Sequence, residues 1–401
     1  MRVLALNAGS SSLKFALIDV GAGARVASGL VDEIGRPSSV ARFRREDGTT
    51  EDGPGAASHS EAVERVLARL GADGLDDGLG ATGHRIVHGG ERFAAPAVID
   101  DAVLGTIDAL RELAPLHNGP AVDALRAARA ALPGVPAVAT FDTAFHAAMP
   151  EVARHYAIDP DLADRHGIRR YGFHGLAHRS MLEAYAAHAG RAPEDVRVVT
   201  FQLGNGCSAA AVAGGRSVDT TMGLTPLEGL VMGTRSGDVD PALVGFLMRR
   251  EGATIDEVET LLNRRSGLLG VSGRSRDMRE LLAAEAEGDR RAGLAVDLFC
   301  YRARKVLGSY LAVLGGADAV VLGGGIGANA PAVRARICGG MEWCGVRVDP
   351  GANAALAAPG LVSPAGARPE VFVAEVDEET AIARDAAACV AAPELSDGRL
   401  G

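Results

Sequence analysis

The chain has 401 residues, of which 47% are apolar and 23% are charged, a balance typical of a soluble globular protein with room for two domains. Its formal net charge of -10 argues against nucleic acid as the main partner, so an anionic substrate would need cations gathered locally. No apolar run approaches the roughly 18 residues of a membrane helix, and the N-terminus lacks the apolar core of a secretory signal, so we expect a cytoplasmic protein with no membrane partner.

The first twenty residues predict a β-hairpin. Two β-rich runs, Arg2 to Asn7 and Leu13 to Val20, flank a small polar turn at Gly9 to Ser12. Backbone N–H groups and hydroxyls in such a turn can surround an anion, and Lys14 would add a point charge. Lys14 and Lys305 are the only lysines among 41 basic residues. An ordinary solvent-exposed hairpin fits the same pattern, so both interpretations stay open.

A helix and a short strand follow the hairpin. Ser58 to Leu70 has apolar residues on one helical face, and Ser58 has capping-box spacing to Glu61. The segment "GHRIVHGG", Gly83 to Gly90, predicts a strand that ends in a glycine turn. Alternation places Arg85 and Val87 on one face, where a cation beside a small apolar side chain suits a small carboxylate. A solvent-facing arginine is the simpler alternative.

The next elements suggest where a ligand would gather. A helix is expected over Gly119 to Ala131, and Val135 to Phe141 reads as a buried strand whose far end carries Asp142. In open α/β sheets ligands bind outside the carboxyl ends of the strands, which makes Asp142 a candidate site residue.

The second half of the chain repeats this design. The loop "IRRYGFHGLAHRS" enters a helix, and residues 196–215 again give an apolar strand, a small polar turn and a second strand. A long helix over Arg290 to Leu314, a strand–glycine turn–helix over 317–337 and a strand–helix over 369–390 complete the chain. One strand–turn–strand unit near the start of each half predicts a duplicated fold, and the alternation of strands with helices predicts the α/β class.

Several polar residues have simple structural explanations. Asp277 and Asp377 to Glu379 stand where helices begin, so capping and the helix dipole explain them. Arg235 lies in the glycine-flanked loop "MGTRSGDVDP", and Gly351 to Ala367 is expected to be a surface loop. His84 and His88 have no cysteine or acidic cluster nearby, which argues against a metal site there. The five cysteines form no CxxC pair, which predicts reduced thiols.

Nine segments together resemble one family. The set resembles the acetokinase (acetate kinase) family of the acetate and sugar kinase, heat-shock chaperone and actin superfamily, over almost the whole chain. The segments occur in this order: "LNAGSSSLKF", "GHRIVHGGERF", "LAPLHN", "TFDTAFH", "YGFHG", "LGNG", "TPLEGLVMGTRSGDVDP", "DMR" and "GGGIGAN".

The resemblance implies an α/β fold of two duplicated actin-like (ribonuclease H-like) domains around a nucleotide cleft, and a homodimer. Residues 1–147 with 377–401 would form the N-terminal domain, completed by the C-terminal helix, and 148–376 the nucleotide-binding domain. The implied reaction is reversible, direct in-line phosphoryl transfer from ATP to acetate with Mg²⁺, or possible Mn²⁺, giving acetyl phosphate for acetyl-CoA biosynthesis.

Residue roles follow from the resemblance position by position. The catalytic positions are Asp142, Arg235, His174 and Arg85. The substrate positions are Arg85, Val87, Leu116, His117, Phe173 and Pro226. The nucleotide positions are Lys14, Gln202, Leu203, Gly204, Asn205, Gly206, Asp277, Met278, Arg279, Gly325, Ile326, Gly327, Ala328 and Asn329. The metal positions are Asn7 and Glu378.

Two departures from the family pattern leave the phosphoryl donor open. Gln202 stands where the family usually has histidine, and Gln cannot become cationic. Ala328 replaces the usual acidic residue. A donor other than ATP, a propionate or butyrate kinase, and a nucleotide-binding chaperone- or filament-like module are the alternatives. Because a carboxylate substrate is already ionised at pH 7, we expect Asp142 to orient groups rather than to remove a proton.

Overall fold

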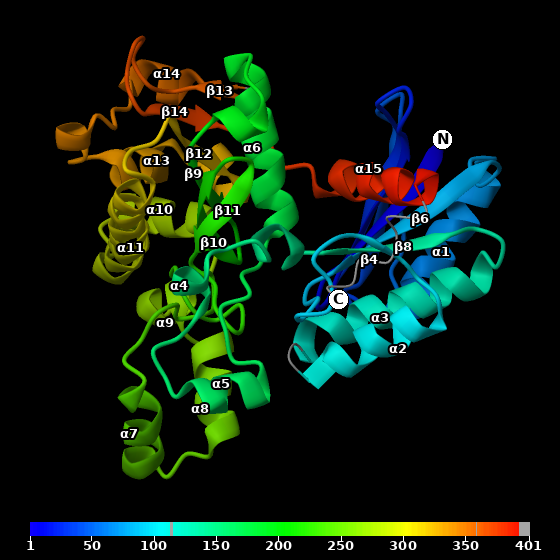
Figure 1. Ribbon diagram of the computed structural model, residues 1–401, viewed down its shortest axis with the longest axis horizontal. Helices are drawn as coiled ribbons and strands as arrows, with labels where there is room; N and C mark the ends of the chain where they lie inside the picture. The colour runs from blue at the N-terminus through cyan, green and yellow to red at the C-terminus, as the bar shows by residue number, and fades with distance from the viewer. Residues whose placement is uncertain (113–114, 358, 393–401) are drawn as a thin grey trace. The chain divides into compact units, whose positions relative to one another are not determined.

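The structure is a computed structural model that describes the whole chain except residues 113–114, 358 and 393–401 (Figure 1). The chain divides into two compact units, of which unit 1 is Met1–Ala147 with Asp377–Gly401 and unit 2 is Ala148–Val376. Among the described residues, no helix has both the length and the apolar character needed to cross a membrane.

Unit 1 is built on one sheet with the strand order β5-β4-β3-β2-β1-β6-β8-β7. Strands β1 to β5 form a continuous antiparallel meander, whereas β6 and β8 run parallel to β1. The strands are β1 (Arg2–Ala8), β2 (Leu13–Asp19), β3 (Ala24–Asp32), β4 (Val40–Arg45), β5 (Thr50–Pro54), β6 (Leu79–Ile86), β7 (Ala97–Val98) and β8 (Ala137–Phe141). The predicted hairpin and the predicted buried strand are therefore both present.

Helices cover both faces of this sheet. Helix α15 (Glu378–Ala391) lies on one face against β1 and β6, and α1 (His59–Ala72) and α3 (Pro115–Ala131) lie on the other (Figure 1). Helix α2 (Asp101–Ala109) packs on α3. The predicted cap of α1 is half correct: the Ser58 hydroxyl accepts from the Glu61 N–H, but the Glu61 carboxylate accepts from Ala57 rather than from Ser58.

Unit 2 has a second sheet with the strand order β11-β10-β9-β12-β14-β13. Its strands are β9 (Val198–Leu203), β10 (Cys207–Ala213), β11 (Arg216–Thr220), β12 (Ala319–Gly323), β13 (Gly360–Leu361) and β14 (Glu370–Val373). The order and the directions match β3-β2-β1-β6-β8-β7 of unit 1 strand for strand, including the antiparallel edge strand beside the last parallel one. The prediction of an α/β chain with a duplicated fold is thus confirmed.

Two helices pack on a sheet other than the one whose strand they follow in the sequence. Helix α6 (Gly175–Ala189) comes after β8 of unit 1 in the sequence but packs on β9 and β12 of unit 2. Helix α15 comes after β14 of unit 2 but packs on the sheet of unit 1. Each sheet is therefore covered by a helix that follows, in the sequence, the last parallel strand of the other sheet.

The remaining helices belong to unit 2. The longest, α11 (Arg290–Leu314), has the predicted bounds and packs on β9 and β10. The others are α4 (Glu151–Arg154), α5 (Pro160–His166), α7 (Ala242–Glu251), α8 (Ile255–Arg264), α9 (Gly267–Ser272), α10 (Met278–Ala286), α12 (Gly324–Asn329), α13 (Pro331–Cys338) and α14 (Pro350–Ala355).

The expected surface loop over Gly351 to Ala367 is wrong in part. Helix α14 occupies its beginning, because the Asp349 side chain accepts from the Ala352 N–H at 2.7 Å and Pro350 takes the first helical position. Strand β13 pairs with β14. Within the same range, Ala358 lies outside the described residues.

A buried arginine organises the chain around α12. Arg334 is 1% exposed and donates to the carbonyl oxygens of Gly327 and Ala328 and to the Asn353 side chain. Helix termini leave carbonyl groups without intrahelical partners, and a buried carbonyl without a partner costs about 1–3 kcal/mol. Arg334 thus satisfies the last carbonyls of the "GIGAN" helix and fixes that segment to α13.

Acid should destabilise the fold through His84. This side chain is buried in β6, contacts the Thr82 hydroxyl, and has its pKa lowered by burial to about 3. The unfolded chain binds a proton that the folded chain does not, so stability falls as pH falls from about 6.5 toward 3. In the wild type, the unfolding free energy should be lower near pH 5 than near pH 7.5. We expect His84→Gln to make this decrease about 2 kcal/mol smaller.

Urea unfolding at the two pH values measures that difference. His166, exposed on α5, is the matched control, because His166→Gln leaves the buried His84 in place and should therefore keep the wild-type difference. Equal pH dependence in the wild type and in His84→Gln would contradict the assignment.

Candidate active site

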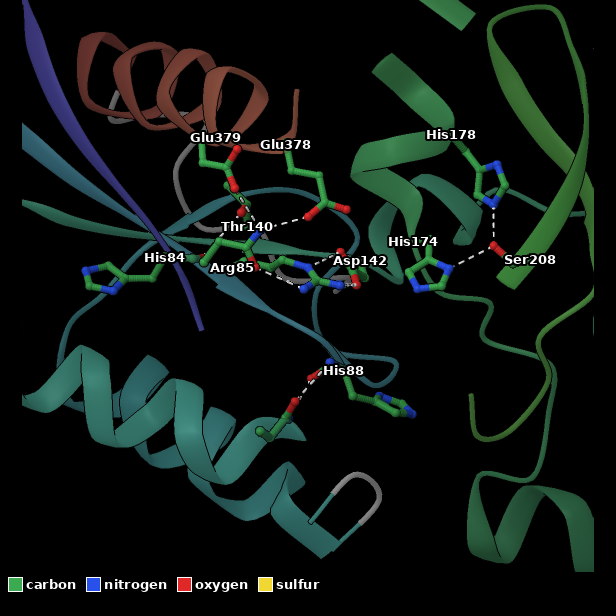
Figure 2. Close-up of polar contacts among 12 residues, drawn as sticks. His84, Arg85, His88, Thr140, Asp142, His174, His178, Ser208, Glu378 and Glu379 are labelled. Carbon is green, nitrogen blue, oxygen red and sulfur yellow. Dashed lines mark hydrogen bonds and ion pairs between the residues drawn. The ribbon is translucent and has the colours of Figure 1, made fainter. Parts of the chain in front are cut away.

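The carboxyl ends of three strands of unit 1 carry one cluster of charged and amide side chains (Figure 2). Arg85 donates from Nε and Nη2 to the two carboxylate oxygens of Asp142, at 3.0 and 2.5 Å, and from Nη1 to Asn7 Oδ1 at 3.0 Å. The Asn7 amide nitrogen donates in turn to Glu378 at 2.8 Å and to Glu379 at 3.1 Å. The predicted residues Arg85, Asp142, Asn7 and Glu378 therefore form one connected network.

Burial makes this cluster electrostatically strong. Asp142 is fully buried, and the Arg85 side chain is 14% exposed. Burial alone would lower the pKa of Arg85, but the charges of Asp142 and Glu378 outweigh it and raise that pKa. The guanidinium therefore stays charged and is held in one orientation by a bidentate pair.

The strand register explains why these residues meet. Strands β6 and β8 are parallel neighbours, and the Asp142 N–H extends their ladder by donating to the Ile86 carbonyl at 3.0 Å. Asn7 lies near the end of β1, directly opposite Lys14 in β2, so the two side chains share a face of the sheet. Asp377 caps α15, which brings Glu378 and Glu379 to the same end of the sheet.

The donor set of this cluster suits a hard divalent cation. Glu378 and Glu379 present carboxylate oxygens, which are ligands that Mg²⁺ prefers, whereas the Asn7 amide oxygen accepts from Arg85. Within the part of the chain that the structure describes, no group of three or more His, Cys, Asp or Glu residues could form a full metal cage. The two neighbouring carboxylates of Glu378 and Glu379 fit Mg²⁺, which usually binds through one or two carboxylates together with substrate phosphates.

In unit 2, the turn between β9 and β10 brings several predicted residues together. A side-chain carbon at Gly206 would lie 3.3 Å from His174 Nε2 and 3.5 Å from Arg235 Nη2, so glycine lets both side chains approach the turn. The Asn205 carbonyl accepts from the Gly233 N–H at 3.0 Å, which fixes the Arg235 loop to the turn. Arg235 itself donates to the Pro226 carbonyl at 2.8 Å.

The same turn touches the start of α12. Gly324 has φ +74°, and a side-chain carbon there would lie 2.6 Å from the Leu203 carbonyl oxygen, so this position requires glycine. The same side-chain carbon at position 324 would lie 2.9 Å from Gln202 Oε1, a buried oxygen with no hydrogen-bond partner among the described residues. The predicted nucleotide segments 202–206 and 325–329 are therefore neighbours.

Arg235 and Cys207 are both affected by burial. Burial lowers the pKa of Arg235, which remains a cation because arginine does not deprotonate in proteins. Burial raises the pKa of the Cys207 thiol to about 12, so this side chain is neutral at physiological pH. The turn thus presents a guanidinium beside uncharged groups.

The other predicted residues are placed as follows. Val87 is buried in unit 1, and Phe173 is buried in unit 2. Asp277 is the N-cap of α10, as expected, with Met278 in the core and Arg279 exposed. The substrate positions Leu116 and His117 lie in α3, and their side chains lie outside the described residues.

Sequence reasoning missed several residues that support the site. Glu379 shares Asn7 with Glu378. Arg170 pairs with Glu228 at 2.6 Å and donates to the Thr221 carbonyl, which joins the loop before His174 to the loop before Arg235. His178 contacts Ser208 one helical turn after His174, and the i, i+4 spacing in "HGLAH" was the signal that could have found it.

A sequence model of the acetokinase family matches residues 2–384. The chain belongs to the acetokinase family. An acetate kinase of Streptomyces coelicolor is 51% identical over 396 residues, with 97% of each chain covered.

Solved structures with the acetokinase fold cover nearly the whole chain as well. An acetate kinase of Porphyromonas gingivalis has a TM-score of 0.90 and 38% identity, covering 96% of this chain and 99% of that one. A propionate kinase of Francisella tularensis has a TM-score of 0.91 and 36% identity, with the same coverage. Both clusters described above therefore lie within the span over which the chain matches this family.

Proposed function

We propose that the chain is an acetate kinase that reversibly transfers the γ-phosphoryl group of ATP to acetate, giving acetyl phosphate and ADP. The observation that carries the proposal is the guanidinium of Arg85, fixed by Asp142 and Asn7 at the carboxyl ends of β1, β6 and β8. These bonds use three of the five N–H donors of Arg85, so among the described residues two remain to hold a carboxylate. Family membership supports the assignment.

Charge neutralisation is the main task of such a site. The acetate carboxylate is ionised at pH 7, so no base is needed to create the nucleophile. The obstacle is that an anion must approach the polyanionic phosphate chain, and phosphoryl transfer depends on positioning and electrostatics. We assign Arg85 to acetate, and Arg235 and His174 to charge on the transferring group.

Asp142 acts in this scheme as a positioning group. Both of its carboxylate oxygens are engaged by Arg85, which leaves it suited to orient the guanidinium rather than to take a proton from a substrate that has none to give. Lys14, the turn 202–206 and the segments 277–279 and 325–329 would contact the nucleotide. Asn7 and Glu378, with Glu379, would hold Mg²⁺ or Mn²⁺, which when bound neutralises phosphate charge.

Substrate selectivity would rest on the apolar residues. From the family resemblance we assign Val87, Leu116, Phe173 and Pro226 to recognition of the methyl group, and His117 to the substrate as well. One methylene in such a pocket is worth about 1–3 kcal/mol, so propionate should be a poorer substrate rather than an excluded one. Propionate or butyrate kinase activity is the alternative, because a relative with a very similar fold is named a propionate kinase.

A hydroxylamine assay tests the function. Acyl phosphate trapped as hydroxamate should appear with ATP and acetate, with kcat/KM for propionate about 5- to 200-fold lower and for butyrate lower still. GTP and pyrophosphate serve as parallel donors, because Gln202 and Ala328 depart from the usual family residues. Higher kcat/KM with propionate would reassign the substrate, and no acyl phosphate with any donor would favour a nucleotide-binding module without this activity.

Asp142→Asn tests the role of the carboxylate. The amide can still accept one hydrogen bond from Arg85, but the ion pair is lost, so we expect kcat to fall at least about 100-fold, with a smaller change in KM for acetate. Steady-state kinetics by the hydroxamate assay measures both constants. Asp52→Asn is the control, since Asp52 pairs with Arg42 on the exposed surface. Near-normal turnover in Asp142→Asn would rule out an essential charge at this position.

We further propose that the enzyme is a cytoplasmic homodimer whose product serves acetyl-CoA biosynthesis. Helix α7 carries an apolar sequence, ALVGFLM, yet none of its residues is buried within the chain, and Phe246 is 50% exposed. Ile255 of α8 and Val239 extend this exposed apolar patch. A second copy of the chain would cover it.

Light scattering checks the dimer. We expect about twice the 41.1 kDa chain mass for the wild type, and a single-chain mass for Phe246→Asp, because a charge on the patch opposes its burial. Val313→Asp is the control on α11, an exposed apolar residue away from α7. A wild type of 41.1 kDa at micromolar concentration would contradict the proposal.

A further inference from the structure

Four side chains of unit 2 form a hydrogen-bonded chain that ends at His174. His174 Nδ1 lies 2.9 Å from Ser208 Oγ, which lies 2.8 Å from His178 Nε2 (Figure 2). His178 Nδ1 lies 2.7 Å from Thr200 Oγ1. Ser208, His178 and Thr200 are fully buried, whereas His174 is half-buried. The chain therefore links the sheet interior to the histidine whose other nitrogen faces Gly206.

The direction of each hydrogen bond can be assigned in turn, starting from Thr200 at the buried end of the chain. With the Thr200 hydroxyl assigned as a donor to the Ala210 carbonyl, 3.4 Å away, its oxygen is the acceptor for His178 Nδ1–H, 2.7 Å away. A neutral imidazole with a proton on Nδ1 has an acceptor at Nε2, so the Ser208 hydroxyl donates to His178. The single proton of Ser208 is then used, and its oxygen accepts from His174 Nδ1–H.

This direction fixes the tautomer of His174. Its proton is on Nδ1, and a second proton would enter at Nε2, the nitrogen 3.3 Å from the position of a side-chain carbon on Gly206. Ser208 accepts from Nδ1–H in both protonation states, so the chain need not rearrange when the ring becomes cationic. Only the cationic ring carries a donor at Nε2, and because Ser208 already fixes the ring orientation, that donor costs no reorganisation during reaction.

We infer that Thr200, His178 and Ser208 are positioning residues that set the ring orientation and the tautomer of His174. The catalytic consequence rests on the proposed phosphoryl transfer, in which the cationic form of His174 would donate from Nε2–H to the transferring group beside Arg235. The tautomer itself depends only on the hydrogen bonds of unit 2. His174 is the residue before α6 and has φ +58°, a backbone conformation that non-glycine residues seldom adopt and that often occurs at functional positions.

Nitrogen-15 NMR of histidine-labelled protein reads the tautomer directly. His174→Gln identifies the His174 resonances among those of the ten histidines. In the full-length wild type, near pH 8, where an ordinary imidazole is neutral, His174 should show a protonated Nδ1. Ser208→Ala should shift it toward a tautomer mixture. Thr200→Val, two hydrogen bonds away, should do the same to a smaller extent, and Thr200→Ser should restore the wild-type spectrum.

Kinetics provide the second measurement. Ser208→Ala and Thr200→Val should lower kcat about tenfold or more with little change in KM, and Thr200→Ser should recover most of the loss. Thr220→Val is the matched control, because this buried hydroxyl donates to the Ala209 carbonyl rather than contacting a histidine. Its kcat and its His174 spectrum should stay as in the wild type.

The outcomes separate this inference from the proposed function. Protonated Nε2 in neutral wild-type His174 would overturn the inferred direction of the chain. An unchanged His174 spectrum in Thr200→Val would overturn coupling through His178. If the wild type forms no acyl phosphate while the tautomer and its response to Thr200→Val are as described, the proposed function fails and the hydrogen-bonded chain stands.

Discussion

The ion pair of Arg85 and Asp142 is the interaction on which the site in unit 1 depends. A buried ion pair loses hydration that its mutual attraction repays only when the geometry is good, so such a pair rarely adds stability. Here the geometry is bidentate, and it exists because β6 and β8 are parallel neighbours in a fixed register. A slip of one residue would send Arg85 to the opposite face. The fixed register of the two strands therefore sets the orientation of the Arg85 guanidinium. Asn7 links this guanidinium by hydrogen bonds to the carboxylates of α15.

The second unit uses the same strand order for a different purpose. Unit 1 places charged side chains at its strand ends, whereas unit 2 places there the glycine-rich turns of residues 202–206 and 323–325. A side-chain carbon at Gly206 would make a tight contact with His174, and one at Gly324 would collide with the Leu203 carbonyl. Removing side chains exposes backbone N–H groups, which suit phosphate, while the side chains of unit 1 suit a carboxylate and a cation. The duplicated fold thus supplies two chemically distinct surfaces from one topology.

Much of this arrangement could be predicted from the sequence, because it depends on local patterns. The bounds of α11 follow from apolar periodicity, and the strand before Asp142 follows from a mostly apolar run. The expected loop over 351–367 failed because α14 has only six residues and β13 only two, too few for a period to emerge. The partners of Arg334 and the link from His178 to Thr200 depend on contacts between segments far apart in sequence, and one sequence does not reveal such contacts. The nine family segments suggested candidate site residues, but not which of them touch.

The two site arginines differ in how their charge is balanced, and that difference bears on catalysis. Arg85 has a carboxylate partner, so its charge is already compensated before any substrate binds. Arg235 is mostly buried, and among the described residues its side-chain hydrogen bond goes to the neutral carbonyl of Pro226. Among the described residues, no bonded anion therefore offsets the free-energy cost of burying the Arg235 guanidinium. This agrees with the lowered pKa of Arg235. An anionic group placed against Arg235 would recover that free energy, and the recovery would be greatest for the species with the most negative charge near the guanidinium. In phosphoryl transfer that charge is spread over the oxygens of the moving group, so an uncompensated arginine favours that group over the uncharged surroundings of the resting turn.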